Sequence, residues 1–269
     1  MARLDRLREF VDRLHPSGLL YATYEHRLIA ELDPKRLPRH VAVLADGNRR
    51  WARTNAPDQS LVAGYQAGAD KLKEFVEWCD EIGIPVVTLW VLSTDNFSRA
   101  KREEIEPLLG VIEHMVTDLA ASRRWRVHPV GALDLLPDQS AKRLKLADRD
   151  TADIDGMLVN IAVSYGGRHE LRDAVRSLLA EHAQNGTSID ELAQTLDIEH
   201  IAEHLYTKGQ PDPDLIIRTS GEQRLSGFLM WQSAHSEFYF CEALWPDFRK
   251  VDFIRALRSY GQRERRFGR

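Results

Sequence analysis

The stretch His40-Val41-Ala42-Val43-Leu44-Ala45-Asp46-Gly47-Asn48-Arg49-Arg50-Trp51-Ala52 decides the fold of this chain. Its first half is a short apolar run, which is typical of a fully buried strand. The run stops at a turn sequence, Asp46-Gly47-Asn48, and a helix is expected to follow. In an open α/β sheet, a strand that leads through a turn into a helix places the turn at the carboxyl edge, where ligands bind.

The turn carries groups that suit a metal ion and a phosphate. Asp46 offers a carboxylate for a metal ion, and Gly47 lets the backbone close on a ligand. The N–H groups at the start of the helix, together with Arg50, suit a phosphate. The alternative for this segment alone is an ordinary strand–turn–helix with surface charges.

The composition limits the class of protein. The chain has 269 residues, of which 43% are hydrophobic, and a net charge of −4 gives no basic excess for nucleic acid. Cys79 and Cys241 are too few and too far apart for a disulfide framework, which fits a reducing compartment. No apolar run approaches the roughly 18 residues of a membrane span. We therefore expect a cytoplasmic protein without a nucleic-acid partner.

From His40 onward, short apolar runs alternate with helical patterns, which predicts a single α/β domain with a central, mostly parallel sheet flanked by helices. The predicted strands are residues 40–45, 85–92, 126–130, 157–163, 213–217 and 236–240, and the predicted helices are residues 62–82, 103–121, 138–149, 168–185, 189–206 and 250–264. Residues 1–36 are expected to form a helical extension, with two helices over residues 4–32, ahead of a domain over residues 37–269. The apolar stripe of the first helix suits either packing within the protein or peripheral contact with a lipid surface.

Four predicted strands end in loops rich in Gly, Asn, Ser and Arg. Besides the opening turn, these loops are Ser93-Thr94-Asp95-Asn96-Phe97-Ser98-Arg99, Ser164-Tyr165-Gly166-Gly167-Arg168, and the segment from Arg218 to Gly227. Arginine with small hydroxyl residues suits phosphate or diphosphate. The chain has no G-x-x-x-x-G-K-[ST], G-x-G-x-x-G or G-x-S-x-G sequence, so P-loop, Rossmann and α/β-hydrolase sites are unsupported.

A second acid, Glu237, precedes the aromatic run Phe238-Tyr239-Phe240. At the mouth of that strand it would suit a magnesium site shared with Asp46, because Mg²⁺ takes one or two protein carboxylates plus phosphate oxygens and water. The sequence alone favours the alternative, a surface glutamate.

These motifs together resemble the cis-prenyltransferases, the undecaprenyl diphosphate synthase family. The residues that carry the resemblance are Asp46-Gly47-Asn48-x-Arg50-Trp51-Ala52, Ser93-x-x-Asn96-Phe97-x-Arg99, Tyr165-Gly166-Gly167-Arg168, Asp214-Leu215-Ile216-Ile217-Arg218-Thr219, Arg224-Leu225-Ser226 and Glu237. The resemblance covers about residues 37 to 268 and looks closest to the actinobacterial short-chain group. It implies a homodimer with an apolar tunnel that leads away from the strand edge.

The resemblance implies that residues 37–269 are a catalytic domain that joins isopentenyl diphosphate to an allylic diphosphate, geranyl diphosphate in the first instance. The implied product is (2Z,6E)-farnesyl diphosphate, and the alternatives are a medium- or long-chain polyprenyl diphosphate synthase or a non-catalytic partner subunit. Because Asp46 and the Arg266-Phe267-Gly268 tail are both kept, a partner subunit is disfavoured.

The resemblance also implies roles for individual residues. Mg²⁺ is expected on Asp46 and Glu237, and Asn96 is expected to assist removal of the C2 proton, with the released diphosphate as the rival base. Val91 is expected to limit product length. The residues expected to bind substrate are Gly47, Asn48, Arg49, Arg50, Trp51, Ser93, Thr94, Asp95, Phe97 and Arg99, together with Arg218, Arg224, Leu225, Ser226, Arg266 and Gly268 for isopentenyl diphosphate.

The chain departs from the family pattern at four positions that concern diphosphate handling. Arg49 stands where the family usually has glycine, and Leu61 where it often has arginine. Tyr65 and Gln223 each stand where histidine is usual.

Overall fold

The computed structural model of the chain describes residue 25 and residues 27–58, 60–99 and 102–263, with the backbone alone at residues 98, 99 and 102–104. The chain divides into two compact units, residues 39–247 and residues 1–38 with 248–269. The predicted boundary between residues 36 and 37 stays a prediction.

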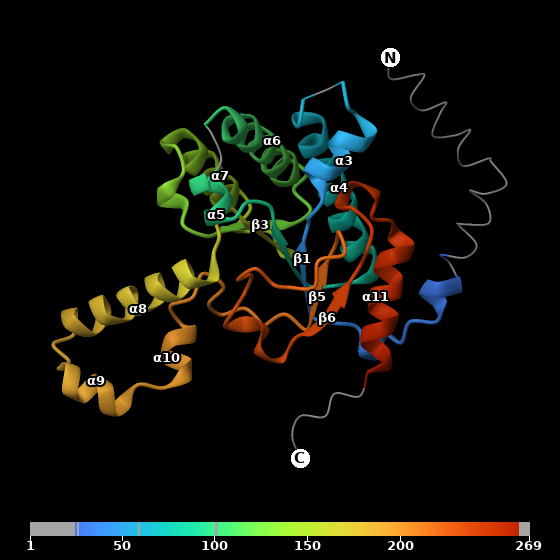
Figure 1. The fold of residues 1–269 in the computed structure, drawn as a ribbon. Helices are drawn as coiled ribbons and strands as arrows, with labels where there is room; N and C mark the ends of the chain where they lie inside the picture. Colours follow the sequence, from blue (N-terminus) through green and yellow to red (C-terminus); the bar gives the residue numbers. More distant parts are fainter. Residues whose placement is uncertain (1–24, 26, 59, 100–101, 264–269) are drawn as a thin grey trace. The chain divides into compact units, whose positions relative to one another are not determined.

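Six strands form the central sheet of the larger unit, in the order β3-β4-β2-β1-β5-β6 (Figure 1). The strands are β1 (His40–Leu44), β2 (Val86–Trp90), β3 (Arg126–Val130), β4 (Leu158–Ala162), β5 (Leu215–Arg218) and β6 (Glu237–Phe240). All five strand pairs are parallel. The predicted α/β class is confirmed, and the sheet is parallel throughout rather than mostly parallel.

β1 lies inside the sheet, between β2 and β5, and all five of its residues are buried, as its apolar run predicts. After β1 the chain continues to β2, β3 and β4 on one side and returns to β5 on the other. The carboxyl end of β1 is therefore a topological switch point, the place where open α/β sheets bind their ligands.

Helices connect the strands of the larger unit. They are α3 (Asn48–Asn55), α4 (Val62–Ile82), α5 (Thr94–Arg99), α6 (Arg102–Ala121), α7 (Asp138–Asp150), α8 (Gly167–Gln184), α9 (Ile189–Thr195) and α10 (Ile198–Ala202), with the short 3₁₀ turns η2 (Leu133–Leu135), η3 (Gln232–His235) and η4 (Trp245–Asp247). α4, α6 and α7 pack side by side and contact β2 or β3 (Figure 1). None of the described helices is both long and apolar enough to cross a bilayer.

One face of the sheet carries an aromatic cluster near its carboxyl edge. Trp90 and Phe228 stack with ring centroids 5.1 Å apart, and Tyr165 meets Phe228 edge-on at 5.8 Å. Leu44 and Ile216 of the neighbouring strands pack in the same cluster. Because residues of the segment after β5 form this cluster with residues of β1, β2 and β4, that segment lies over the strand ends.

The single helix predicted over residues 189–206 is wrong, because two short helices, α9 and α10, occupy that range. The break falls at Asp197, whose carboxylate accepts from the N–H of Ile198 and whose own N–H donates to His200 Nδ1 at 2.9 Å. This reciprocal capping starts a new helix and leaves Leu196 extended.

The smaller unit contains a helical segment over residues 27–30, the 3₁₀ turn η1 (Pro34–Arg36) and α11 (Lys250–Gln262). Leu28 packs with Val251 and Ile254 of α11 in a small core. Most of the two helices predicted over residues 4–32 lies outside the described residues.

Candidate active site

The turn after β1 holds the Asp46 carboxylate at the switch point. Gly47 has φ of 111°, and a Cβ there would lie 2.9 Å from Leu244, so only glycine fits. The backbone of Asp46 is fixed by the Thr219 hydroxyl, which accepts from its N–H at 3.0 Å and donates to its carbonyl at 2.8 Å. The Asp46 side chain remains 42% exposed. The backbone is thus rigid while the carboxylate faces solvent.

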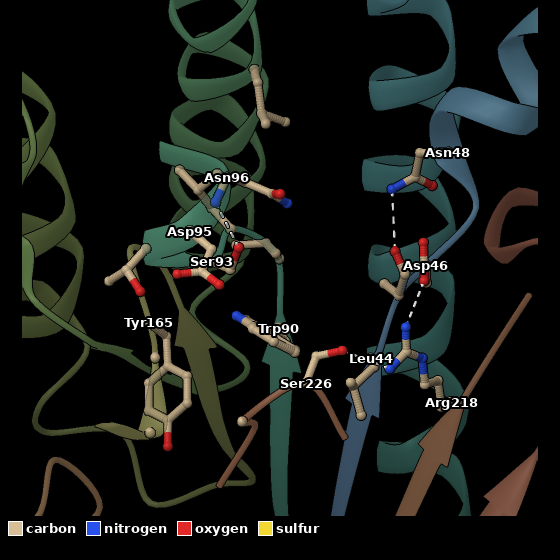
Figure 2. Close-up of a pocket in the computed structure, with 18 of the residues that line it drawn as sticks. Leu44, Asp46, Asn48, Trp90, Ser93, Asp95, Asn96, Tyr165, Arg218 and Ser226 are labelled. Atoms are coloured by element: carbon tan, nitrogen blue, oxygen red, sulfur yellow. Dashed lines mark hydrogen bonds and ion pairs between the residues drawn. The ribbon is translucent and has the colours of Figure 1, made fainter. Parts of the chain in front are cut away.

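Arg218, the last residue of β5, links Asp46 to the loop after β5. Its side chain is only 5% exposed, and its Nη2 donates to Asp46 Oδ2 at 3.0 Å (Figure 2). Its Nη1 donates to Ser226 Oγ at 3.0 Å and to the Arg224 carbonyl. Its Nε is buried without a hydrogen-bond partner among the described residues. The residues predicted for the metal and for the second diphosphate therefore adjoin one another.

A cavity of about 860 Å³ opens at this edge of the sheet. It brings together most of the predicted site residues: Asp46, Gly47, Asn48, Arg49, Arg50, Val91, Ser93, Thr94, Asp95, Asn96, Arg218, Arg224 and Ser226. Figure 2 shows Asp46 and Arg218 on one side of this space and Ser93, Asp95 and Asn96 on the other. The predicted apolar tunnel stays a prediction, and Val91 lies in the wall of the cavity with Ile105 and Leu108.

The segment with Ser93 and Asn96 is anchored to the end of β4. Ser93 Oγ accepts from the N–H of Asn96 at 3.0 Å, and Thr94 N–H donates to the Tyr165 carbonyl at 3.0 Å. Thr94 Oγ1 also lies 3.4 Å from His169 Nδ1. Asn96 itself is exposed at the cavity. The backbone of this arm is held while its amide is open to a ligand.

Five arginines line the cavity, which gives it a cationic wall: Arg49, Arg50, Arg168, Arg218 and Arg224. Arg50 donates to the Ser220 carbonyl at 3.3 Å. Arg49 and Arg168 are exposed and make no hydrogen bond or ion pair with any residue that the structure describes. Arginines held this way suit bidentate contacts to phosphate oxygens.

Some predicted substrate-binding residues do not line the cavity. Trp51 instead donates its Nε1 proton to Asp247 Oδ1 at 2.8 Å, which joins α3 to η4, and Leu225 packs against the aromatic cluster. Phe97 is half-buried outside the cavity lining. The side chain of Arg99, and Arg266 and Gly268 as a whole, lie outside the described residues.

The prediction that Asp46 and Glu237 of the same chain share a metal ion is wrong. β6 runs parallel to β5, so Glu237 lies opposite Leu215 at the amino end, three residues before the level of Arg218. Asp46 lies two residues beyond Leu44, which pairs with Arg218. The three strand residues span roughly 10 Å at about 3.3 Å per residue, and β6 lies two strands from β1, which adds about 9 to 10 Å sideways. Because Mg²⁺ binds oxygens at about 2 Å, the two carboxylates of one chain do not hold the same ion.

Several residues of the cavity wall were not predicted from the sequence: Trp90, Ile105, Leu108, His169 and Met230. Ile105 and Leu108 are spaced i, i+3 on α6, so helical periodicity could have placed them on one face. His169 and Met230 carry no comparable signal, because they reach the cavity only through the tertiary fold.

The donor set near Asp46 fits a cation that a phosphate ligand completes. Among the described residues, no group of three or more His, Cys, Asp or Glu side chains could hold a metal ion. Mg²⁺ commonly binds one or two protein carboxylates and fills its remaining positions with phosphate oxygens and water. The half-exposed Asp46 carboxylate beside five arginines meets that requirement.

The chain is similar to known prenyltransferases over most of its length. Residues 44–268 match the prenyltransferase family model described as undecaprenyl diphosphate synthase. The chain is 60% identical over 249 residues to (2Z,6E)-farnesyl diphosphate synthase of Thermobifida fusca, covering 93% of this chain and 97% of that protein. It is 57% identical over 250 residues to isoprenyl transferase 1 of Streptomyces avermitilis, covering 93% and 96%.

A solved structure shares the fold. The crystal structure of lavandulyl diphosphate synthase from Lavandula x intermedia, in complex with dimethylallyl diphosphate, is 31% identical with a TM-score of 0.80. The alignment covers 87% of this chain and 100% of that one. The predicted resemblance is confirmed: the chain belongs to the undecaprenyl diphosphate synthase family of prenyltransferases.

Proposed function

We propose that the chain is a Mg²⁺-dependent cis-prenyltransferase that joins isopentenyl diphosphate to geranyl diphosphate and releases (2Z,6E)-farnesyl diphosphate and diphosphate. The C1–O bond of the allylic substrate breaks, C1 bonds to C4 of isopentenyl diphosphate, and a proton leaves C2. One observation carries the proposal: Asp46 and Arg218 pair at 3.0 Å in a cavity that four further arginines line. A relative at 60% identity is named for this activity.

The allylic diphosphate would lie at the start of α3. Arg49 and Arg50 line the cavity there, and a helix start with such cations would stabilise the charge that develops as the C1–O bond breaks. Asp46 would hold Mg²⁺ together with phosphate oxygens and water. The bound ion would supply further positive charge at the leaving diphosphate.

Isopentenyl diphosphate would lie on the other side of the Asp46–Arg218 pair. Arg218, Arg224 and Ser226 line the cavity there, above the apolar surface of Trp90. Fixing both substrates in one cavity brings C1 and C4 into contact, which is the main contribution that positioning makes to a reaction of two molecules.

The C2 proton would leave toward Asn96 and the released diphosphate. Asn96 lines the cavity on the arm opposite Asp46 (Figure 2). An amide is a poor base, so Asn96 would orient the departing proton and the diphosphate oxygens would accept it.

Val91 would limit the length of the product. It stands directly after β2 and lines the cavity together with Ile105 and Leu108 of α6. A bulky wall at this point leaves less room for each added five-carbon unit, which favours a C15 product.

The proposal includes a homodimer in the cytoplasm, with peripheral contact at the inner face of the membrane. The family resemblance supports the homodimer, because it implies a partner subunit whose Arg266 and Gly268 reach the isopentenyl diphosphate site. The apolar stripe predicted for the first helix supports the membrane contact.

Product analysis tests the proposal directly. The purified chain would be incubated with Mg²⁺, radiolabelled isopentenyl diphosphate and either geranyl or farnesyl diphosphate, and the dephosphorylated products separated by length and double-bond geometry. A C15 product from geranyl diphosphate with a new cis bond is expected. Products of C50 or longer would instead establish a long-chain synthase, and no turnover at all would leave the partner-subunit alternative.

A further inference from the structure

Glu170, in the first turn of α8, is a carboxylate that the proposed reaction does not use. It is 1% exposed and does not line the cavity. Its Oε2 accepts from the Tyr165 hydroxyl at 2.5 Å, and its Oε1 accepts from Tyr206 N–H and Gln232 Nε2, each at 3.1 Å. A buried carboxylate is costly unless it is well hydrogen-bonded, and here all three donors are neutral. Burial raises the pKa of Glu170.

The three donors come from three separate segments of the larger unit. Tyr165 follows β4, Tyr206 follows α10, and Gln232 opens η3. Gln232 Nε2 also donates to Thr207 Oγ1 at 2.9 Å, which ties the last two segments to each other. Glu170 therefore links three segments: the end of β4, the chain after α10 and the start of η3.

The carboxyl-terminal part of residues 224–230, here called the site loop, is hydrogen-bonded to this network. Leu229 N–H donates to the Tyr165 hydroxyl at 3.2 Å, and Gly167 N–H donates to the Gly227 carbonyl at 2.9 Å. Tyr165 thus accepts from the loop while it donates to Glu170. The stacked Phe228 fills the space between these two bonds.

The site loop needs such support because its backbone is strained. Ser226 has φ of 51° and Leu229 has φ of 44°, a left-handed backbone conformation that residues other than glycine rarely adopt. Strain of this kind persists only when the surroundings over-determine it. The hydrogen bonds of Tyr165 and Gly167 hold the backbone at Leu229 and Gly227, the residues on either side of Phe228.

We propose that Glu170 is a positioning residue for isopentenyl diphosphate: acting through Tyr165 and Gln232, it holds the site loop so that Arg224 and Ser226 present their polar groups to the second diphosphate. This inference rests on the proposed function of that subsite. Glu170 touches no substrate, so its loss should weaken one substrate selectively and leave the allylic side, at Arg49 and Arg50, unchanged.

Two variants and one control test the role. Glu170→Gln keeps the shape but turns an amide toward the Tyr165 hydroxyl, and Tyr165→Phe removes that hydroxyl while keeping the ring. The control is Asp173→Asn, on the same helix, because Asp173 accepts from the Tyr206 hydroxyl at 2.6 Å without lining the cavity. Both KM values, kcat and the melting temperature would be measured for each.

For Glu170→Gln and Tyr165→Phe, the KM for isopentenyl diphosphate should rise at least about tenfold, since a misplacement near 1 Å costs up to about a hundredfold. The KM for geranyl diphosphate should stay within about twofold, and Asp173→Asn should match the wild type. An equal rise in both KM values, or an unchanged KM for isopentenyl diphosphate in a folded variant, would overturn the role. If Glu170→Gln does not fold, Tyr165→Phe decides.

Calorimetric titration of isopentenyl diphosphate, without an allylic substrate, separates this inference from the proposed function. The wild type should bind, and Glu170→Gln should bind at least about tenfold more weakly. If the wild type makes no product, the proposed function is refuted. If wild type and Glu170→Gln bind isopentenyl diphosphate equally tightly, the role of Glu170 is refuted, whatever the turnover.

Discussion

Two polar networks involve opposite ends of β1: one includes His40, its first residue, and the other includes the turn after Leu44, its last. At the amino end, His40 Nδ1 donates to the Pro211 carbonyl at 2.7 Å, and its Nε2 lies 2.8 Å from the Thr88 hydroxyl, which accepts from Asn160 at 3.0 Å. Asn160 and Gln210 exchange two amide hydrogen bonds. At the carboxyl end, Arg218 joins Asp46 to Ser226.

The two networks differ in charge and in completeness. At the amino end, every buried polar atom of the four side chains has a hydrogen-bond partner. At the carboxyl end, three buried atoms have no hydrogen-bond partner among the described residues: Arg218 Nε, Ser220 Oγ and Asn48 Oδ1. A buried network with every group satisfied stabilises a fold. The carboxyl-end network is open to a ligand, because the Asp46 side chain is 42% exposed and arginines line the cavity beside it. The same sheet thus keeps stability at one end and binding capacity at the other.

The largest expected effect on activity is that of a substitution at Asp46. In Asp46→Ala we expect kcat to fall by about a thousandfold, because the charge that would hold Mg²⁺ and that pairs with Arg218 is lost. The protein should remain folded, since the carboxylate is 42% exposed and water can replace it at Arg218. Steady-state turnover with geranyl and isopentenyl diphosphate measures the first effect, and circular dichroism the second.

The matched control is Asp138→Ala, an exposed aspartate on α7 outside the cavity lining. Its turnover should equal that of the wild type. A folded Asp46→Ala enzyme with more than about a tenth of wild-type kcat would contradict the assignment of Asp46 to the chemistry.

Acid should break the amino-end network through His40. Burial lowers the pKa of His40 to about 4 from 6.5, although the Pro211 carbonyl and Asp214 act in the opposite direction. The unfolded chain takes up the proton first, so the stability of the larger unit is complete above pH 6.5 and falls as the pH drops toward 4. Over that range we expect a loss of about 3 kcal/mol in the free energy of unfolding from this group.

Urea unfolding at several pH values measures this loss. The reference is His40→Gln, which cannot take up the proton, so its unfolding free energy should fall less steeply between pH 6.5 and 4. Parallel pH profiles for the two proteins would show that His40 does not carry the effect.

Thr88→Val should open the same network without a change of charge. It removes the donor to His40 Nε2 and one acceptor of Asn160 while keeping the shape. A buried group left without its partner costs about 2 kcal/mol of unfolding free energy, and kcat should stay at the wild-type level. Thr117→Val on the exposed side of α6, where the hydroxyl only donates to the Glu113 carbonyl, is the control and should cost far less. A drop in kcat without loss of stability would refute the division between the two ends.

Local pattern gave the strands and most of the helices, because burial on both faces imposes apolar runs such as residues 41–44. It could also group Asp46 with Arg218, since parallel strands bring their carboxyl ends to one edge. The position of Glu237 depends on strand direction and register, which an isolated aromatic run does not encode. Glu170 was beyond reach for a related reason: two of its three donors stand 36 and 62 residues away in the chain.

The smallest expected effect is at Arg49, because this cation forms no interaction with the described residues that the substitution would remove. Arg49 is exposed, lines the cavity and makes no ion pair or hydrogen bond with any described residue. In Arg49→Ala the KM for geranyl diphosphate should rise by about fivefold, near 1 kcal/mol, with the unfolding free energy unchanged. Arg53→Ala, an exposed arginine one turn further along α3 outside the cavity lining, should leave both quantities unchanged. A lower unfolding free energy for Arg49→Ala with an unchanged KM for geranyl diphosphate would show that Arg49 stabilises the fold and does not bind the allylic substrate.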